Sequence, residues 1–163
     1  MNIEQVRKFA MKLLKDNIAA RLQEIDTAQG DGTTTPAPTE YYEYPVPVEN
    51  LMSFPVCFVF SDGMPKRNQD ESGIEQRGFQ FTIELWYSSW DGAEVQRHIE
   101  RATAAAGSLL ETDDLWAKER LFNPIVEEVQ LREGVDNQGN QLRVASMTLE
   151  VQGLHLKGGW QIV

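Results

Sequence analysis

Residues 77–88 read RGFQFTIELWYS, and this stretch decides the fold. Its apolar and polar side chains alternate, with Phe79, Phe81, Ile83 and Leu85 on one side of the chain. Alternation with a period of two is typical of a β-strand that has one covered face. We therefore expect a strand with one face on a core and the other face wet or shared.

Another strand is predicted just before it, over residues 54–61, where bulky apolar side chains predominate. The two strands are separated by a polar segment, residues 62–75, which is much longer than the two to five residues of a tight hairpin. We expect this connection to be a mobile loop, and its 65–71 portion to become ordered only on assembly.

Amphipathic helices are predicted on both sides of these strands. Apolar residues recur every three or four positions over residues 3–25, and Asn2 with Gln5 makes the N-x-x-Q of a capping box. The second helix should begin at Asp91, with Glu94 at its capping-box position. Its small alanines would let it approach a sheet closely, and a short extra turn is expected after it.

A β-hairpin is predicted to close the chain, over residues 124–132 and 141–153. In its second strand the apolar phase slips by one residue between Val144 and Ala145, which predicts a bulge there. These elements indicate an α+β fold in one domain over residues 1–163. The expected architecture is a mostly antiparallel four-stranded sheet with an N-terminal helix and a second helix packed on it.

Residues 27–50 combine prolines with three tyrosines and show no periodicity, so no regular element is expected there. This segment is either a surface loop whose tyrosines fold back on their own domain or an arm that docks on a neighbouring copy. The C-terminal tail, residues 154–163, is apolar with a glycine pair. The residues expected in subunit or partner contacts are Tyr41, Tyr42, Tyr44 and Trp160.

The charge balance restricts the partners. Twenty-five acidic residues against 15 basic ones give a net charge of −10, which opposes binding to the phosphates of nucleic acid. The apolar fraction of 41% is sufficient for a packed core. No run approaches the roughly 20 apolar residues that span a bilayer, and the N-terminal helix is interrupted by charges throughout. We expect a protein that is made in the cytoplasm and needs no membrane.

No motif for chemistry stands out. Cys57 lies in an apolar run, so we expect a buried thiol with a raised pKa. His98 and His155 have no chelating spacing, and His98 is expected on the solvated face of its helix. Asp113 and Asp114 should bound a short helix. The neighbouring pair Glu127 and Glu128 should point to opposite faces of a strand.

These features predict no catalytic residue, no metal site and no cofactor, and therefore a protein that is not an enzyme.

The order of elements resembles the tail terminator and tail-completion family of tailed bacteriophages, which is related to head-to-tail joining proteins. The local sequence pattern is also similar in the strands at 55–60 and 79–87 and in the helix at 91–111. The resemblance implies a hexameric ring at the head-proximal end of the tail, in the virion. Such a ring binds the tail tube protein, stops tube polymerisation and connects to the neck. DNA would pass through its lumen without specific binding.

Two alternatives remain open. One is a neck or head-tail connector protein of a phage. The other is a small acidic inhibitor or immunity-type protein that neutralises a basic nuclease through complementary charge.

Overall fold

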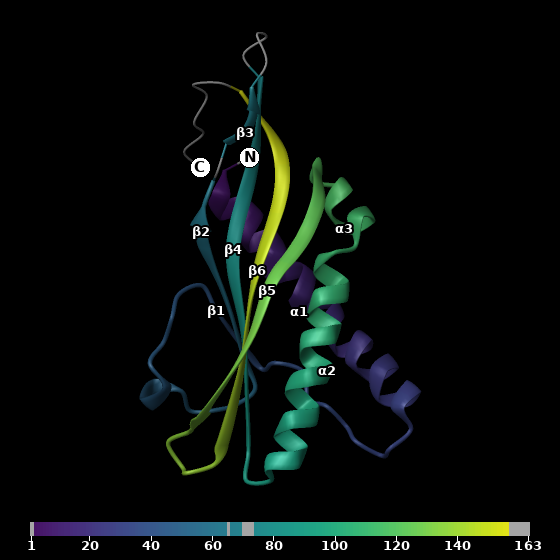
Figure 1. The fold of residues 1–163 in the computed structure, drawn as a ribbon, viewed down its shortest axis with the longest axis vertical. Coiled ribbons are helices and arrows are strands. Elements are labelled where there is room, and N and C mark those ends of the chain that lie inside the picture. Colours follow the sequence, from purple (N-terminus) through teal and green to yellow (C-terminus); the bar gives the residue numbers. More distant parts are fainter. Residues whose placement is uncertain (1, 65, 70–73, 157–163) are drawn as a thin grey trace.

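The computed structural model describes residues 2–64, 66–69 and 74–156. Figure 1 shows a long, strongly twisted sheet with helices beside it. The helices are α1 (Ile3–Gln29), α2 (Gly92–Leu110) and α3 (Asp113–Ala117), with one 3-10 turn, η1 (Val48–Asn50). The strands are β1 (Glu40–Tyr42), β2 (Val56–Gly63), β3 (Lys66–Gln69), β4 (Ile74–Ser89), β5 (Leu121–Val135) and β6 (Gln141–Leu156).

The centre of the sheet is the antiparallel pair β4 and β6. Each strand has 16 residues, and the pairing continues without a register shift from Ile74 opposite Leu156 to Ser89 opposite Gln141. The strand order is β1-β2-β4-β6-β5, and β3 pairs with β4 beyond that path. The strand predicted over 77–88 is therefore confirmed and is longer than predicted.

The main core lies between one face of this sheet and the helices α1 and α2. Phe79, Phe81, Ile83 and Leu85 all point into it, as the alternation predicted. From β6 the same face receives Ala145, Met147, Leu149 and Val151, which share their side of the sheet with the odd-numbered residues of β4. α2 contributes an alanine-rich stripe that lies close to the strands.

The opposite face is covered at one end by a second, smaller apolar cluster. Val56 and Phe58 of β2 lie there with Leu51, and the Phe58 ring packs 5.2 Å from the Trp86 ring and 5.3 Å from that of Tyr42. The segment around η1 thus packs back over the sheet. The second face of β4 is therefore covered in part by the chain itself.

The sheet has more strands than expected, because both predicted loops contain one. The segment 27–50 supplies β1, which pairs in parallel with β2, as well as the end of α1 and η1. The prediction of no regular element there is wrong: the Glu-Tyr-Tyr run has strand-forming side chains and lies beside a free edge of β2. In the predicted loop 62–75, β2 continues to Gly63 and β3 pairs with β4. Residues 65 and 70–73 lie outside the described ranges.

The predicted bulge between Val144 and Ala145 is also wrong. Both residues lie in the uninterrupted register with β4, and both apolar sets are buried. Val144 is opposite Trp86, on the face that the η1 segment partly covers. The change of apolar phase therefore marks the place where the sheet becomes covered on both faces.

The predicted helix caps are largely confirmed. The Asn2 side chain accepts from the amide of Gln5 and the Gln5 side chain accepts from the amide of Asn2, each at 2.9 Å, which completes the capping box. Asp91 caps α2 through the amides of Ala93 and Glu94. The Glu94 side chain accepts from Ser89 instead of completing a box. Among the described residues, no helix is both long and apolar enough to cross a membrane.

The predicted extra turn after α2 is helix α3, which closes one end of the core. Asp113 and Asp114 stand in its first turn, as expected. Its Trp116 is fully buried, donates to the carbonyl of Leu110 at 2.7 Å and lies edge-on to the Phe9 ring at 5.2 Å.

Leu85→Ala should lower the free energy of unfolding by about 3 kcal/mol, because it leaves a cavity at a fully buried position of the central strand. Chemical denaturation measures the change. The control is Trp90→Ala, because the Trp90 side chain is 81% exposed. Its free energy of unfolding should stay within about 0.5 kcal/mol of the wild-type value. Equal losses in the two variants would contradict this account of the core.

Candidate assembly surface

The most unusual surface of the molecule lies on β5, the last strand of the sheet. Every residue from 127 to 135 is exposed, on both faces of the strand. Val129, Leu131 and Val135 leave 48%, 51% and 62% of their surfaces open. We call residues 127–135 the β5 edge surface. It combines exposed apolar side chains with an open strand edge, a combination that soluble proteins normally avoid unless another chain covers it.

Among the described residues, no helix covers this surface. α2 packs mainly against β4 and β6, and α3 packs against β5, whose first residues include buried Leu121. The outer edge of β5 is closed at one point, where the amide of Val126 donates to the Glu111 side chain at 2.9 Å. Beyond that point, within the part of the chain that the structure describes, β5 pairs only with β6. In Figure 1 the lower ends of this hairpin and of α2 lie on either side of the end of β4.

Two register shifts shape β5, one between Phe122 and Ile125 and one between Glu127 and Gln130. Glu128 has a φ of 47°, in the left-handed region, as expected of a residue in a bulge. Bulges increase local twist and often mark strand edges. The two glutamates at 127 and 128 therefore flank an irregularity, where the simple rule of opposite faces does not decide their directions.

The predicted contact tyrosines occupy three different environments. Tyr41 packs partly against the main core, with the Lys15 ammonium 5.9 Å from its ring centroid. Tyr42 stacks on Phe58 in the second cluster. Tyr44 is 64% exposed. Trp160 lies outside the described residues. A role for these four residues in contacts between subunits stays a prediction, and Tyr44 offers the largest free area of the three described.

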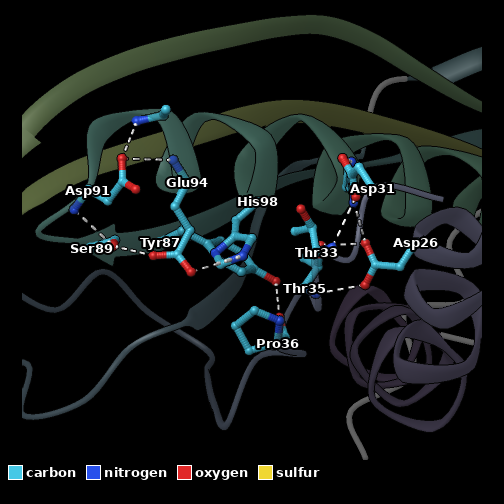
Figure 2. Close-up of polar contacts among 12 residues, drawn as sticks. Asp26, Asp31, Thr33, Thr35, Pro36, Tyr87, Ser89, Asp91, Glu94 and His98 are labelled. Atoms are coloured by element: carbon cyan, nitrogen blue, oxygen red, sulfur yellow. Dashed lines mark hydrogen bonds and ion pairs between the residues drawn. The ribbon is translucent and has the colours of Figure 1, made fainter. Parts of the chain in front are cut away.

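The segment after α1 is fixed to the domain by a polar network, drawn in Figure 2. The Arg101 guanidinium donates to Asp26 at 2.8 Å and also to Asp31. The amide and hydroxyl of Thr35 both donate to Asp26, at 2.7 and 2.8 Å. The Tyr87 hydroxyl donates to the carbonyl of Pro36 at 2.7 Å. This part of the 27–50 segment is therefore held against the rest of the domain.

The same contacts determine the protonation of the two carboxylates. Hydrogen bonds from Arg101 hold the pKa of Asp31 far below its ordinary value. For Asp26, burial favours the neutral acid, but hydrogen bonds from Thr35 and Arg101 outweigh it and lower the pKa. Both groups are charged near neutral pH. Their hydrogen bonds are used within the fold, so the network is structural.

His98 differs from its prediction. It was expected on the solvated face of α2, yet it is 7% exposed and lies between the Tyr87 ring and Glu94. Its Nε2 is buried and has no hydrogen-bond partner among the described residues. Burial lowers the pKa of His98, and the Glu94 charge opposes this only in part. The helical pattern missed this because the Tyr87 ring comes from β4, far away in the sequence.

Cys57 is fully buried in β2, as predicted, and burial raises the pKa of its thiol. A thiol in that state is a poor nucleophile at neutral pH. Within residues 2–64, 66–69 and 74–156, no three His, Cys, Asp or Glu side chains come together as metal ligands.

A cavity of about 360 Å³ lies between residues 51–54 and the turn of the β5–β6 hairpin. Asp136 is the acid that lines it. Its carboxylate accepts from Ser88, from the amides of Gln138 and Asn140 and from the Asn140 side chain. These bonds lower its pKa against the effect of burial. The carboxylate is thus part of the turn, and the cavity lacks an ionisable group left for a ligand.

No family model matches the chain, and no curated protein matches it. Among solved structures, one similar chain belongs to the virion of a native gene transfer agent particle. The two are 18% identical, and the match covers 71% of this chain and 80% of that chain with a TM-score of 0.44. A likeness of this extent carries no argument about function. The function is therefore inferred from the surfaces described above.

The burial of His98 predicts a pH dependence of stability. Because its pKa in the fold lies below the ordinary 6.5, the neutral form is favoured by folding. Its contribution is complete above about pH 7 and is lost as the pH falls through the lower folded value. Wild-type protein should therefore lose stability between about pH 7 and about pH 5, and His98→Asn should lose less.

Urea denaturation across this range measures the effect. His155→Asn, which changes the other histidine of the chain, should retain the dependence because His98 is still present. Parallel curves for wild-type and His98→Asn proteins would show that His98 does not contribute.

Proposed function

We propose that this chain is a structural protein of a tailed-phage virion, a tail terminator that forms a ring at the head-proximal end of the tail. In this role it caps the tail tube, stops tube polymerisation and connects to the neck. The observation that carries the proposal is the β5 edge surface, with exposed Leu131 and Val135 on an open strand edge. The order of elements, which resembles that family, agrees with it.

An open edge is useful to a protein that assembles. A ring needs two different surfaces on each subunit, because head-to-tail contacts related by rotation close on themselves. This sheet has two different ends: β5 closes one, and the short parallel strand β1 closes the other. Tyr44, two residues past β1, is also strongly exposed. Each subunit therefore has exposed apolar side chains on β5 and just after β1.

The acidity of the chain suits a channel for DNA. Like charge repels phosphates over a Debye length of about 8 Å at physiological salt. With a net charge of −10 on each subunit, the ring would let DNA slide through without specific binding. The tail tube protein and the neck connector would be its other partners.

We propose further that the chain carries out no reaction and holds no cofactor. The groups that could act in catalysis are buried or hydrogen-bonded within the fold. The thiol of Cys57 is buried, His98 is buried beside the Tyr87 ring, and Asp136 is hydrogen-bonded within a turn.

The test is assembly in solution, alone and with purified tail tube protein. Light scattering should detect a species of several subunit masses, and negative-stain images should show an open centre. Added to polymerising tube protein, the ring should shorten the tubes. A protein that stays monomeric even beside the tube protein would contradict the proposal, and one that instead binds and inhibits a basic nuclease would favour the inhibitor alternative.

Leu131→Asp should abolish this assembly, because it places a charge in the apolar part of the contact. The fold should survive, since the side chain is half exposed, and circular dichroism checks this. Ser108→Asp adds the same charge at an exposed position of α2 and should leave assembly unchanged. Normal rings from Leu131→Asp protein would remove the β5 edge surface from the contact.

A further inference from the structure

We propose that the β5 edge surface of one copy binds a lysine stripe on α1 of the next copy. This inference rests on the proposed function and names the two surfaces that meet in the ring. The stripe consists of Lys8, Lys12 and Lys15. Spacings of four and three residues place the three side chains on one face of the helix.

The lysine stripe lies at the opposite end of the sheet from β5. Arg7 of α1 pairs with Glu43, one residue past β1, at 3.2 Å, and Lys15 lies over the ring of Tyr41. In the strand order β1 and β5 stand at opposite ends of the sheet. One copy can therefore present its β5 end to the α1 end of the next, as a closed ring requires.

The two surfaces carry opposite charge. Residues 3–15 of α1 hold four basic side chains and one acid, Glu4, a net charge of +3. Residues 121–135 hold three glutamates and one arginine, a net charge of −2. The chain as a whole is strongly acidic, whereas this helix segment is basic. An acidic strand edge would therefore bind this segment in preference to the rest of the surface.

The lysines can change partners at small cost. Lys8 pairs with Glu4 at 2.5 Å, and Lys12 pairs with Asp16, within the same helix. The side chains of Lys8 and Lys12 are 56% and 71% exposed. Exposed pairs of this kind contribute little to stability, so contacts with a neighbouring copy can replace them.

Apolar contacts complete the interface. Tyr44 follows β1 by two residues, at the same end as the lysine stripe, and is largely exposed. Leu131 and Val135 offer an apolar counterpart on the β5 edge surface. The polar pairs would determine which surfaces meet, and burial of these apolar side chains would supply most of the affinity.

Charge reversal gives a test with an internal rescue. One variant carries Lys12→Glu and Lys15→Glu, and the other carries Glu127→Lys and Glu133→Lys. Each alone should weaken self-association by at least about tenfold, because like charges then face each other. Mixed in equal amounts, the two should assemble again, since every contact between unlike copies restores opposite charges. Analytical ultracentrifugation measures all three samples.

The control for the β5 variant is Glu24→Lys with Glu100→Lys, which makes the same change in charge at two other exposed positions. It should associate like the wild type. If the control weakens association as much as the β5 variant does, or if the mixture fails to assemble, the pairing of these two surfaces is wrong.

A crosslink separates failure of this interface from failure of the proposed function. The native Cys57 is fully buried, so introduced cysteines would be the reactive ones. A chain with Tyr44→Cys and Leu131→Cys should give a ladder of disulfide-linked multimers under mild oxidation. Oligomers that form without this ladder, and that tolerate the charge reversals, would overturn the interface and leave the ring intact. A protein that is monomeric at every concentration, with or without tube protein, would overturn both.

Discussion

The structure depends on the uninterrupted pairing of β4 with β6. Sixteen residues of each strand are matched, from Ile74 opposite Leu156 to Ser89 opposite Gln141. This pairing sets which side chains face α1 and α2 and which face the η1 segment. It also determines what lies at the two ends of the sheet, since β2 and β1 are added on one side and β5 on the other. A shift of one residue would exchange the two faces and expose the core.

Much of the fold could be predicted because its signals are local. The alternation at 77–88 predicts the central strand, and Asn2 with Gln5 predicts the first helix cap. The features that were missed depend on distant contacts. β1 is a strand because it lies beside β2, and His98 is buried where the Tyr87 ring of β4 lies beside α2. Apolar side chains on both faces of β6 looked like a bulge, since sequence periodicity cannot distinguish a change of phase from a second covering layer.

The candidate surface was harder to predict than the fold. Val129, Leu131 and Val135 look in the sequence like the buried face of a strand, but α2 lies mainly over β4 and β6 and leaves them exposed. The tyrosines show the opposite case. They stood out by composition, but Tyr41 and Tyr42 pack largely within their own chain. The exposure of a strand residue depends on which strands the helices cover, and a short sequence pattern does not show this.

The polar network around Arg101 has a consequence for the energetics of association. It holds the C-terminal end of α1 through Asp26, while Arg7 and Glu43 tie the other end to the edge of the sheet. A helix fastened at both ends has little backbone freedom left to lose when a partner arrives. The entropic penalty has thus largely been met during folding, and α1 is preorganised as a rigid template for the next molecule.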